Sequence, residues 1–103
     1  MARPYTQKFL MELGSRQDDS LGTRLARACI HSNLSSTHIA VALGVTRATI
    51  HNWFHGMKIA RSRRPIVEAF LKLVLEDTQK GDLPVTNAKQ SKHYIEMMLG
   101  REI

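Results

Sequence analysis

The chain of 103 residues contains a single cysteine and no apolar run of the roughly 18–20 residues that a membrane-spanning helix needs. One cysteine cannot form a disulfide within the chain. Cys29 lies in an apolar helical pattern, so we expect a small core residue in a reducing compartment rather than a reactive thiol. Residues 1–10 lack the apolar stretch of a secretory signal. These absences predict a cytoplasmic protein with no membrane partner.

Acidic residues are missing from the middle of the chain. No Asp or Glu occurs between positions 20 and 67, although seven Lys and Arg residues do, whereas the flanking parts are close to neutral. The formal net charge of +6 therefore belongs to this segment. A basic face kept for solubility is one interpretation, and a surface facing a polyanion is the one that the complete absence of acids favours.

Groupings typical of catalytic and metal sites are also missing. The sequence shows no Ser/His/Asp grouping, phosphate-binding glycine loop or paired carboxylates, so we expect no enzyme and no cofactor. His51 and His55 form half of a zinc site, but no Cys or carboxylate stands near with ligand spacing, and we expect no metal. Their partial protonation beside phosphates would instead tighten binding as the pH falls through roughly 6.5.

Helical periodicity extends along the chain without sustained apolar–polar alternation, which predicts an all-α fold of five to six helices. We expect one domain over residues 1–103, with a core at 21–80 and helical extensions at 1–20 and 82–103. Six helical segments are predicted, at 5–13, 21–31, 36–43, 46–55, from Pro65 to about Lys80, and 86–99, with a basic extended stretch at 57–64.

Segment 36–55 meets the steric requirements of two short helices that cross over a three-residue turn. Ala40 is small enough to let the backbones approach, and Gly44 can adopt the positive φ of the turn. Five apolar side chains would then face the core: Ile39, Leu43, Val45, Ile50 and Trp53.

This segment resembles the helix-turn-helix of the phage Cro and CI-type repressors, and the likeness covers about residues 21–75. In that family a basic loop ending in Arg-Pro leads to the next core helix, as Arg63-Arg64-Pro65 does here. The resemblance implies a compact Cro/CI repressor-like domain that binds double-stranded DNA sequence-specifically. It also implies a transcriptional regulator, expected to be a repressor of phage or bacterial origin.

The outward side chains of helix 46–55 are placed to enter the major groove once Ile50 and Trp53 point inward. Arg47 can donate two hydrogen bonds to guanine and Asn52 can pair with adenine, each contact discriminating by roughly 1–3 kcal/mol. The candidate base-reading residues are Arg47, Ala48, Thr49, His51 and Asn52.

Phosphate contacts are expected from hydroxyl and basic side chains around the motif. Their candidates are Ser36, Thr46, His55, Lys58, Arg61, Arg63 and Arg64. Four to six such contacts would give a log–log salt slope of about −4 to −5 per monomer. For Arg3, a DNA-contacting arm and a disordered terminus are the alternatives.

Other functions remain open at this point. The chain can be an architectural DNA binder with little base preference, or an antitoxin-like adaptor whose partner is a protein. Trp53 and Phe54 can stack on unpaired bases, as in single-strand binders, or pack in the core, Phe54 against the later helices.

The expected partner besides DNA is a second copy of the chain. The last helix carries an apolar stripe of Ala88, Ile95, Met98 and Leu99, and the helix before it one of Ile66, Phe70, Leu73 and Val74. The last helix can dock on its own core. Alternatively, the chain can dimerise through this helix, through the N-terminal helix, or through both. A two-fold homodimer would read inverted half-sites about 34 Å apart.

Overall fold

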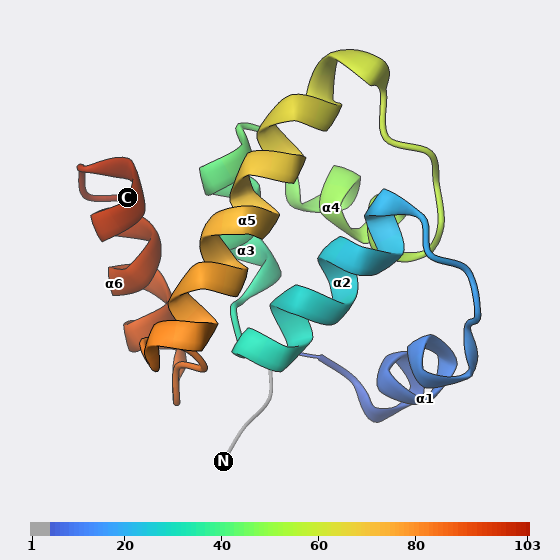
Figure 1. Ribbon diagram of the computed structural model, residues 1–103, viewed down its shortest axis with the longest axis horizontal. Coiled ribbons are helices and arrows are strands. Elements are labelled where there is room, and N and C mark those ends of the chain that lie inside the picture. Colours follow the sequence, from blue (N-terminus) through green and yellow to red (C-terminus); the bar gives the residue numbers. More distant parts are fainter. Residues whose placement is uncertain (1–4) are drawn as a thin grey trace.

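The computed structural model describes residues 5–103, and within them the chain forms α-helices and one short 3₁₀ helix but no strand (Figure 1). The elements are α1 (Gln7–Ser15), α2 (Leu21–Ser32), α3 (Ser36–Leu43), α4 (Arg47–Phe54), the 3₁₀ helix η1 (Arg61–Arg63), α5 (Arg64–Lys80) and α6 (Ala88–Leu99). The expected all-α class is confirmed for this part of the chain. A helix that is long and apolar enough to span a bilayer does not occur among these residues. Arg3 lies outside them.

Short polar side chains determine where the central helices begin. Ser20, Ser35 and Thr46 each accept a hydrogen bond from a backbone N–H in the first turn of α2, α3 and α4. Asn33 and Gly44 adopt the left-handed conformation, with φ of 60° and 68°, and end α2 and α3. The positive φ of Gly44 is the one that the sequence predicts.

Three segments differ from the expectation. Helix α1 spans Gln7–Ser15 rather than 5–13, because the Thr6 side chain caps it by accepting a hydrogen bond from the backbone N–H of Phe9. The basic stretch 57–64 is not extended throughout, because Arg61–Arg63 forms a 3₁₀ turn that continues directly into α5. The last helix begins at Ala88 rather than at Thr86, because the Asn87 side chain caps it by accepting a hydrogen bond from the backbone N–H of Gln90.

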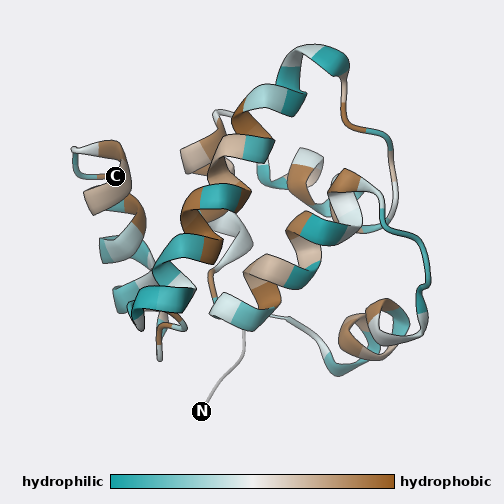
Figure 2. Ribbon diagram, in the orientation of Figure 1, coloured by the Kyte–Doolittle hydropathy of each residue, from teal (hydrophilic) through white to brown (hydrophobic). Residues whose placement is uncertain are grey.

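One hydrophobic cluster joins all six helices. Helices α2 and α5 lie side by side, with α3 and α4 packed behind them (Figure 1). The ribbons in Figure 2 alternate between hydrophobic and hydrophilic residues, as amphipathic helices do around a shared core. Fully buried side chains come from each of the five later helices, among them Leu25, Ile39, Ile50, Val67 and Ile95.

The buried face of α5 is only partly the expected one. Phe70 and Val74 face the core as predicted, but Ile66 and Leu73 are each 43% exposed. Val67 and Leu71 occupy the core positions instead. Apolar residues surround much of this helix, so that its periodicity is compatible with more than one buried face.

Candidate functional site

Helices α3 and α4 are joined by three residues, and the packing between them follows the expected steric pattern. Gly44 has a positive φ, and the backbone N–H of Val45 returns to the carbonyl of Ala40 at 3.0 Å. Ile50 and Trp53 of α4 are buried against α2 and α3. The orientation of α4 about its own axis is therefore fixed by its apolar residues.

A contact between Gly22 and Trp53 sets the distance from α2 to α4. A Cβ atom added at Gly22 would lie 2.5 Å from the backbone oxygen of Trp53, closer than real Cβ atoms come to a non-bonded heavy atom. The two helix backbones thus approach each other directly. The sequence analysis missed this role, although a glycine in the first turn of a helix, where no turn requires it, is a signal of such an approach.

The exposed side of α4 carries most of the candidate base-reading residues. Arg47, Ala48, His51 and Asn52 are exposed, whereas Thr49 is half-buried. The hydroxyl of Thr49 lies 3.0 Å from that of its capping partner Thr46. Four of the five candidates thus share one solvent-facing surface of a rigidly packed helix.

The loop after α4 supplies a basic wall along one flank of this helix. Lys58, Arg61 and Arg63 are exposed, and the guanidinium of Arg63 donates a 3.5 Å hydrogen bond to the carbonyl of Gly44. An open hollow of about 430 Å³ lies between this loop and α4, and Thr46, Thr49, Lys58 and Arg63 help to line it. Arg64 is less available, because it is half-buried and 3.9 Å from the carboxylate of Glu68.

Ser36 does not belong to this surface, which corrects the sequence-based assignment. Its side chain is buried at the start of α3, so its hydroxyl cannot reach a phosphate outside the protein. The exposed hydroxyl in the same turn is that of Thr37. One position along a helix turns a side chain by about 100°, which separates a buried serine from an exposed threonine.

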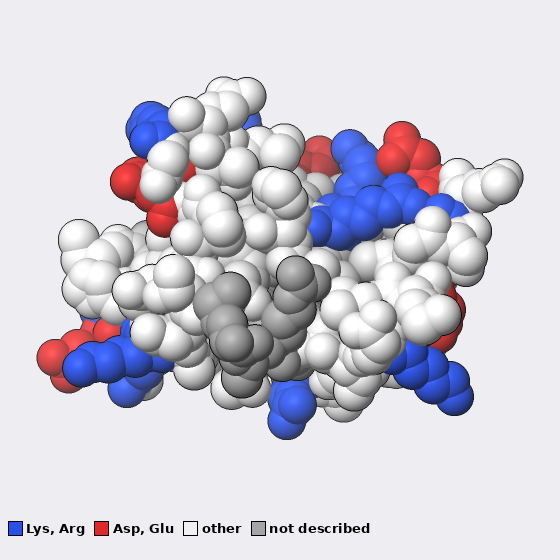
Figure 3. All heavy atoms as spheres, turned by 90° about the horizontal axis from the view of Figure 1, so that it is seen from below, with Lys and Arg blue, Asp and Glu red and all other residues white. Residues whose placement is uncertain are grey.

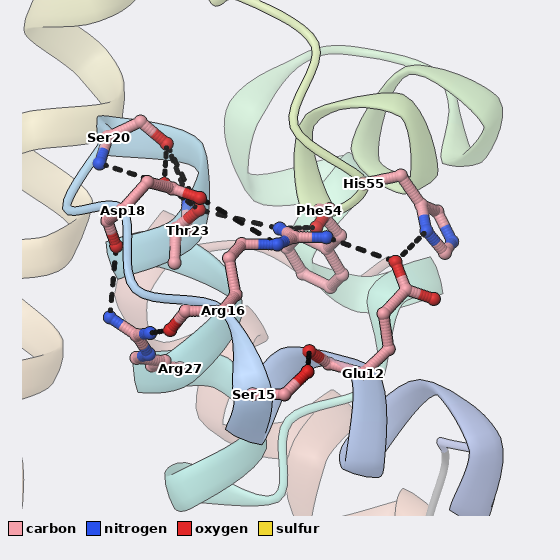
Figure 4. Close-up of polar contacts among 9 residues, drawn as sticks. All are labelled: Glu12, Ser15, Arg16, Asp18, Ser20, Thr23, Arg27, Phe54 and His55. Atoms are coloured by element: carbon pink, nitrogen blue, oxygen red, sulfur yellow. Dashed lines mark hydrogen bonds and ion pairs between the residues drawn. The ribbon is translucent and has the colours of Figure 1, made fainter.

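The carboxyl end of α4 is capped by an arginine from a distant part of the chain. The guanidinium of Arg16 donates a 2.7 Å hydrogen bond to the carbonyl of Phe54, one of the carbonyls that a helix end leaves unpaired (Figure 4). The same group lies 3.2 Å from Glu12 and 3.8 Å from Asp18. Arg16 therefore ties α1, the loop before α2 and the end of α4 together.

Helix α1 packs against this same end of α4. The rings of Phe9 and Phe54 stack with centroids 6.1 Å apart, and Tyr5 lies 6.0 Å from Phe54. Phe54 is buried, and the ring of Phe9 from the N-terminal helix covers part of it. His55 lies edge-on to Phe9 at 5.0 Å, and its Nδ1 is 3.7 Å from the carboxylate of Glu12 (Figure 4).

Helix α1 and the exposed side of α4 enclose a second open hollow of about 450 Å³. Lys8 and Glu12 line it from α1, and Arg47 and His51 line it from α4. The sequence analysis placed no carboxylate near the basic surface, since the middle of the chain has none. The fold brings Glu12 there from outside that segment.

The surroundings of His51 lower its pKa below the ordinary value of 6.5. Partial burial is the largest cause, followed by the positive charges of Arg47 and His55. Any response of this imidazole to acid therefore begins at a lower pH than the roughly 6.5 expected from the sequence.

Helix α6 docks on the chain's own core. Ile95 is buried, Met98 and Leu99 are half-buried, and Ala88 is exposed. The buried hydroxyl of Ser91 accepts a 3.0 Å hydrogen bond from the N–H at the cap of α3. The same hydroxyl also lies 2.8 Å from Nδ1 of the half-buried His38 on α3. Helix α6 is thus docked within the chain, and dimerisation stays a prediction.

One face of the described surface carries charges of both signs. Figure 3 views the molecule from the side opposite the loop at 57–63, and Lys, Arg, Asp and Glu residues are interspersed on that face. Within residues 5–103, no three His, Cys, Asp or Glu side chains are grouped so that they could hold a metal ion.

Comparisons of the chain with protein-family models, with curated proteins and with solved structures gave no match. The function is therefore inferred from the geometry and charge of the surface around α4.

Proposed function

We propose that this protein binds double-stranded DNA sequence-specifically, as a cytoplasmic helix-turn-helix transcriptional regulator of the Cro/CI repressor type. In this proposal α3 and α4 form the motif and α4 is the recognition helix in the major groove. Repression and a phage or bacterial origin belong to the same proposal. The regulator needs no cofactor.

The observation that carries the proposal is the division of α4 into two faces. Ile50 and Trp53 are buried, while Arg47 and Asn52 project into solvent from the same eight-residue helix. Arg and Asn are the residue types that pair bidentately with guanine and adenine edges. A helix held by its apolar face and presenting these groups is suited to base readout.

The surface beside α4 supports a phosphate-binding role. Lys58, Arg61 and Arg63 are exposed on the adjoining loop. No acidic residue occurs in the segment that contains α3, α4 and this loop. Thr37 replaces Ser36 among the candidates, and Thr46 remains one because its side chain is exposed.

Two other modes of nucleic-acid binding receive less support. Trp53 and Phe54 are buried, and all aromatic side chains within residues 5–103 are buried or half-buried, so these residues offer no open platform for stacking unpaired bases. An architectural binder needs no base-reading side chains, yet Arg47 and Asn52 are exposed together. Competition with random duplex tests this mode, because an architectural binder would show no selectivity for any sequence.

Selection of binding sites from a random duplex library tests the proposal, because it reports specificity and half-site symmetry together. We expect Arg47→Ala to relax selectivity at one base pair per half-site, by roughly 1–3 kcal/mol. Arg63→Ala should weaken all sequences about equally and make the salt slope shallower by about one unit. Absence of any enriched sequence, or equal effects of both variants on every sequence, would contradict the proposal.

A homodimer is part of the proposal. With α6 docked on its own core, the exposed apolar side chains available for self-association include Leu73 and Met97, which line one hollow between α5 and α6. Light scattering at tens of micromolar protein should show a dimer, and selected sites should contain inverted repeats one helical turn apart. A strict monomer that selects asymmetric sites would contradict it.

A further inference from the structure

Helix α4 lies between two different walls. One wall is the loop that carries Lys58 and Arg63, across the 430 Å³ hollow from Thr46 and Thr49. The other wall is α1, across the 450 Å³ hollow from Arg47 and His51. At about 100° of rotation per residue, Thr46 and Thr49 lie on the opposite side of the exposed ridge of α4 from Arg47 and His51, so the two walls flank this ridge.

A major groove has the matching arrangement. It is about 12 Å wide, and a phosphate strand borders it on each side, so a helix inside it lies between two negatively charged edges. The basic loop accounts for one of the two strands. The second strand then runs along the wall that α1 forms.

We propose that α1 is a second DNA-backbone contact element and that Lys8 binds a phosphate of the strand opposite the loop. This inference rests on the proposed function, because it requires α4 to occupy the groove. Lys8 is exposed, lines the hollow shared with Arg47 and His51, and presents an ammonium group suited to a phosphate oxygen.

The contacts of α1 with α4 hold the backbone of Lys8 in a fixed place relative to the recognition helix. Arg16 connects the end of α1 to the carbonyl of Phe54, and Phe9 stacks on the Phe54 ring. A lysine on a helix anchored in this way loses less freedom on binding than one in a mobile arm.

Glu12 moderates the charge of the same wall. Its carboxylate is half-exposed one turn after Lys8, between the guanidinium of Arg16 and the imidazole of His55. It repels a phosphate strand on this side, so the wall attracts DNA less strongly than the loop does. Removal of this negative charge should therefore strengthen binding without changing the preferred sequence.

The test compares charge-neutralising variants of the full chain on a selected duplex and on random duplex over a range of salt concentrations. Lys8→Gln should weaken both complexes about five- to tenfold at about 0.1 M salt and make the salt slope shallower by about one unit. Lys80→Gln, which removes the same charge at the far end of α5, is the matched control and should leave both quantities unchanged. Glu12→Gln should tighten both complexes about two- to threefold, whereas Glu102→Gln should not.

Two outcomes separate this inference from the function on which it rests. If Arg63→Gln weakens binding while Lys8→Gln behaves like Lys80→Gln, the role of α1 is refuted and the proposed function stands. If neither Arg63→Gln nor Arg47→Ala changes DNA binding, the proposed function itself fails. Circular dichroism and thermal midpoints close to those of the parent chain establish that the exposed Lys8 variant is folded.

Discussion

The guanidinium of Arg16 and the backbone carbonyl of Phe54 are 38 positions apart in sequence and form a 2.7 Å hydrogen bond. Through this bond, a residue from the loop after α1 completes the last turn of α4. The side chain of Arg16 is only 14% exposed, and its guanidinium also contacts the half-exposed carboxylates of Glu12 and Asp18 (Figure 4).

Loss of the Arg16 network should destabilise the fold. We expect Arg16→Ala to lower the free energy of unfolding by roughly 2 kcal/mol, because a charge-assisted bond and a helix cap are removed together. Arg24→Ala, at an exposed position of α2, is the control and should stay within about 0.5 kcal/mol of the parent. Urea unfolding followed by circular dichroism measures both, and equal effects would show that the cap contributes nothing specific.

Two glycines should respond in opposite ways to alanine. Gly22→Ala should destabilise the protein by about 1–3 kcal/mol, since the new methyl group would collide with the Trp53 carbonyl and push α2 from α4. Gly14→Ala adds a methyl group to α1 where nothing lies within 4 Å, and should stabilise by about 0.5–1 kcal/mol. Thermal unfolding of the two variants, with Trp53 fluorescence as a local probe, distinguishes these effects.

Acid should weaken the fold through Asp18. Hydrogen bonds donated by Thr23 and Ser20 lower the pKa of this carboxyl from 3.8 to about 2. Since the folded pKa is the lower one, its stabilising contribution is complete above about pH 4 and is lost as the pH falls toward 2.

Asp18→Asn tests this assignment, because the amide oxygen can still accept the hydrogen bonds but cannot take up a proton in this range. Urea midpoints between pH 5 and pH 2 should fall less steeply for this variant than for the parent chain. Parallel curves would show that another carboxyl dominates the acid response.

His51 should titrate below its ordinary pKa of 6.5, and Arg47 should be one cause. Protonation adds a positive charge beside the guanidinium, so Arg47→Ala should raise the pKa of His51. Two-dimensional NMR of the imidazole signals against pH measures the shift directly in the free protein. An unchanged midpoint in the Arg47 variant would leave burial and the charge of His55 as the causes.

The sequence predicted the centre of the molecule well. The helix predicted at 36–43 has those bounds in the structure, and Gly44 satisfies a backbone requirement of the turn. Ile50 and Trp53 also fit only one face of their short helix. Each of these features depends on residues close together in the chain, where spacing alone constrains the geometry.

The flanking contacts could not be predicted in the same way. The apolar residues of α1 indicate that this helix is buried against something, but not that Phe9 meets Phe54 or that Glu12 reaches His55. Arg16 stands in a loop, where no periodicity assigns it a partner. The face of α5 was ambiguous because both Ile66 and Val67 lie in apolar stripes, and the packing of the other helices decides between them.

The close approach at Gly22 is one of the contacts that hold α4 in place without its exposed side chains. Helix α4 is seated by a backbone contact, by two inward side chains and by the cap at its end, none of which involves Arg47, Ala48 or Asn52. Replacing these outward residues therefore leaves the framework intact. The exposed residues of α4 can therefore change during evolution, one substitution at a time, without any intermediate variant losing the fold.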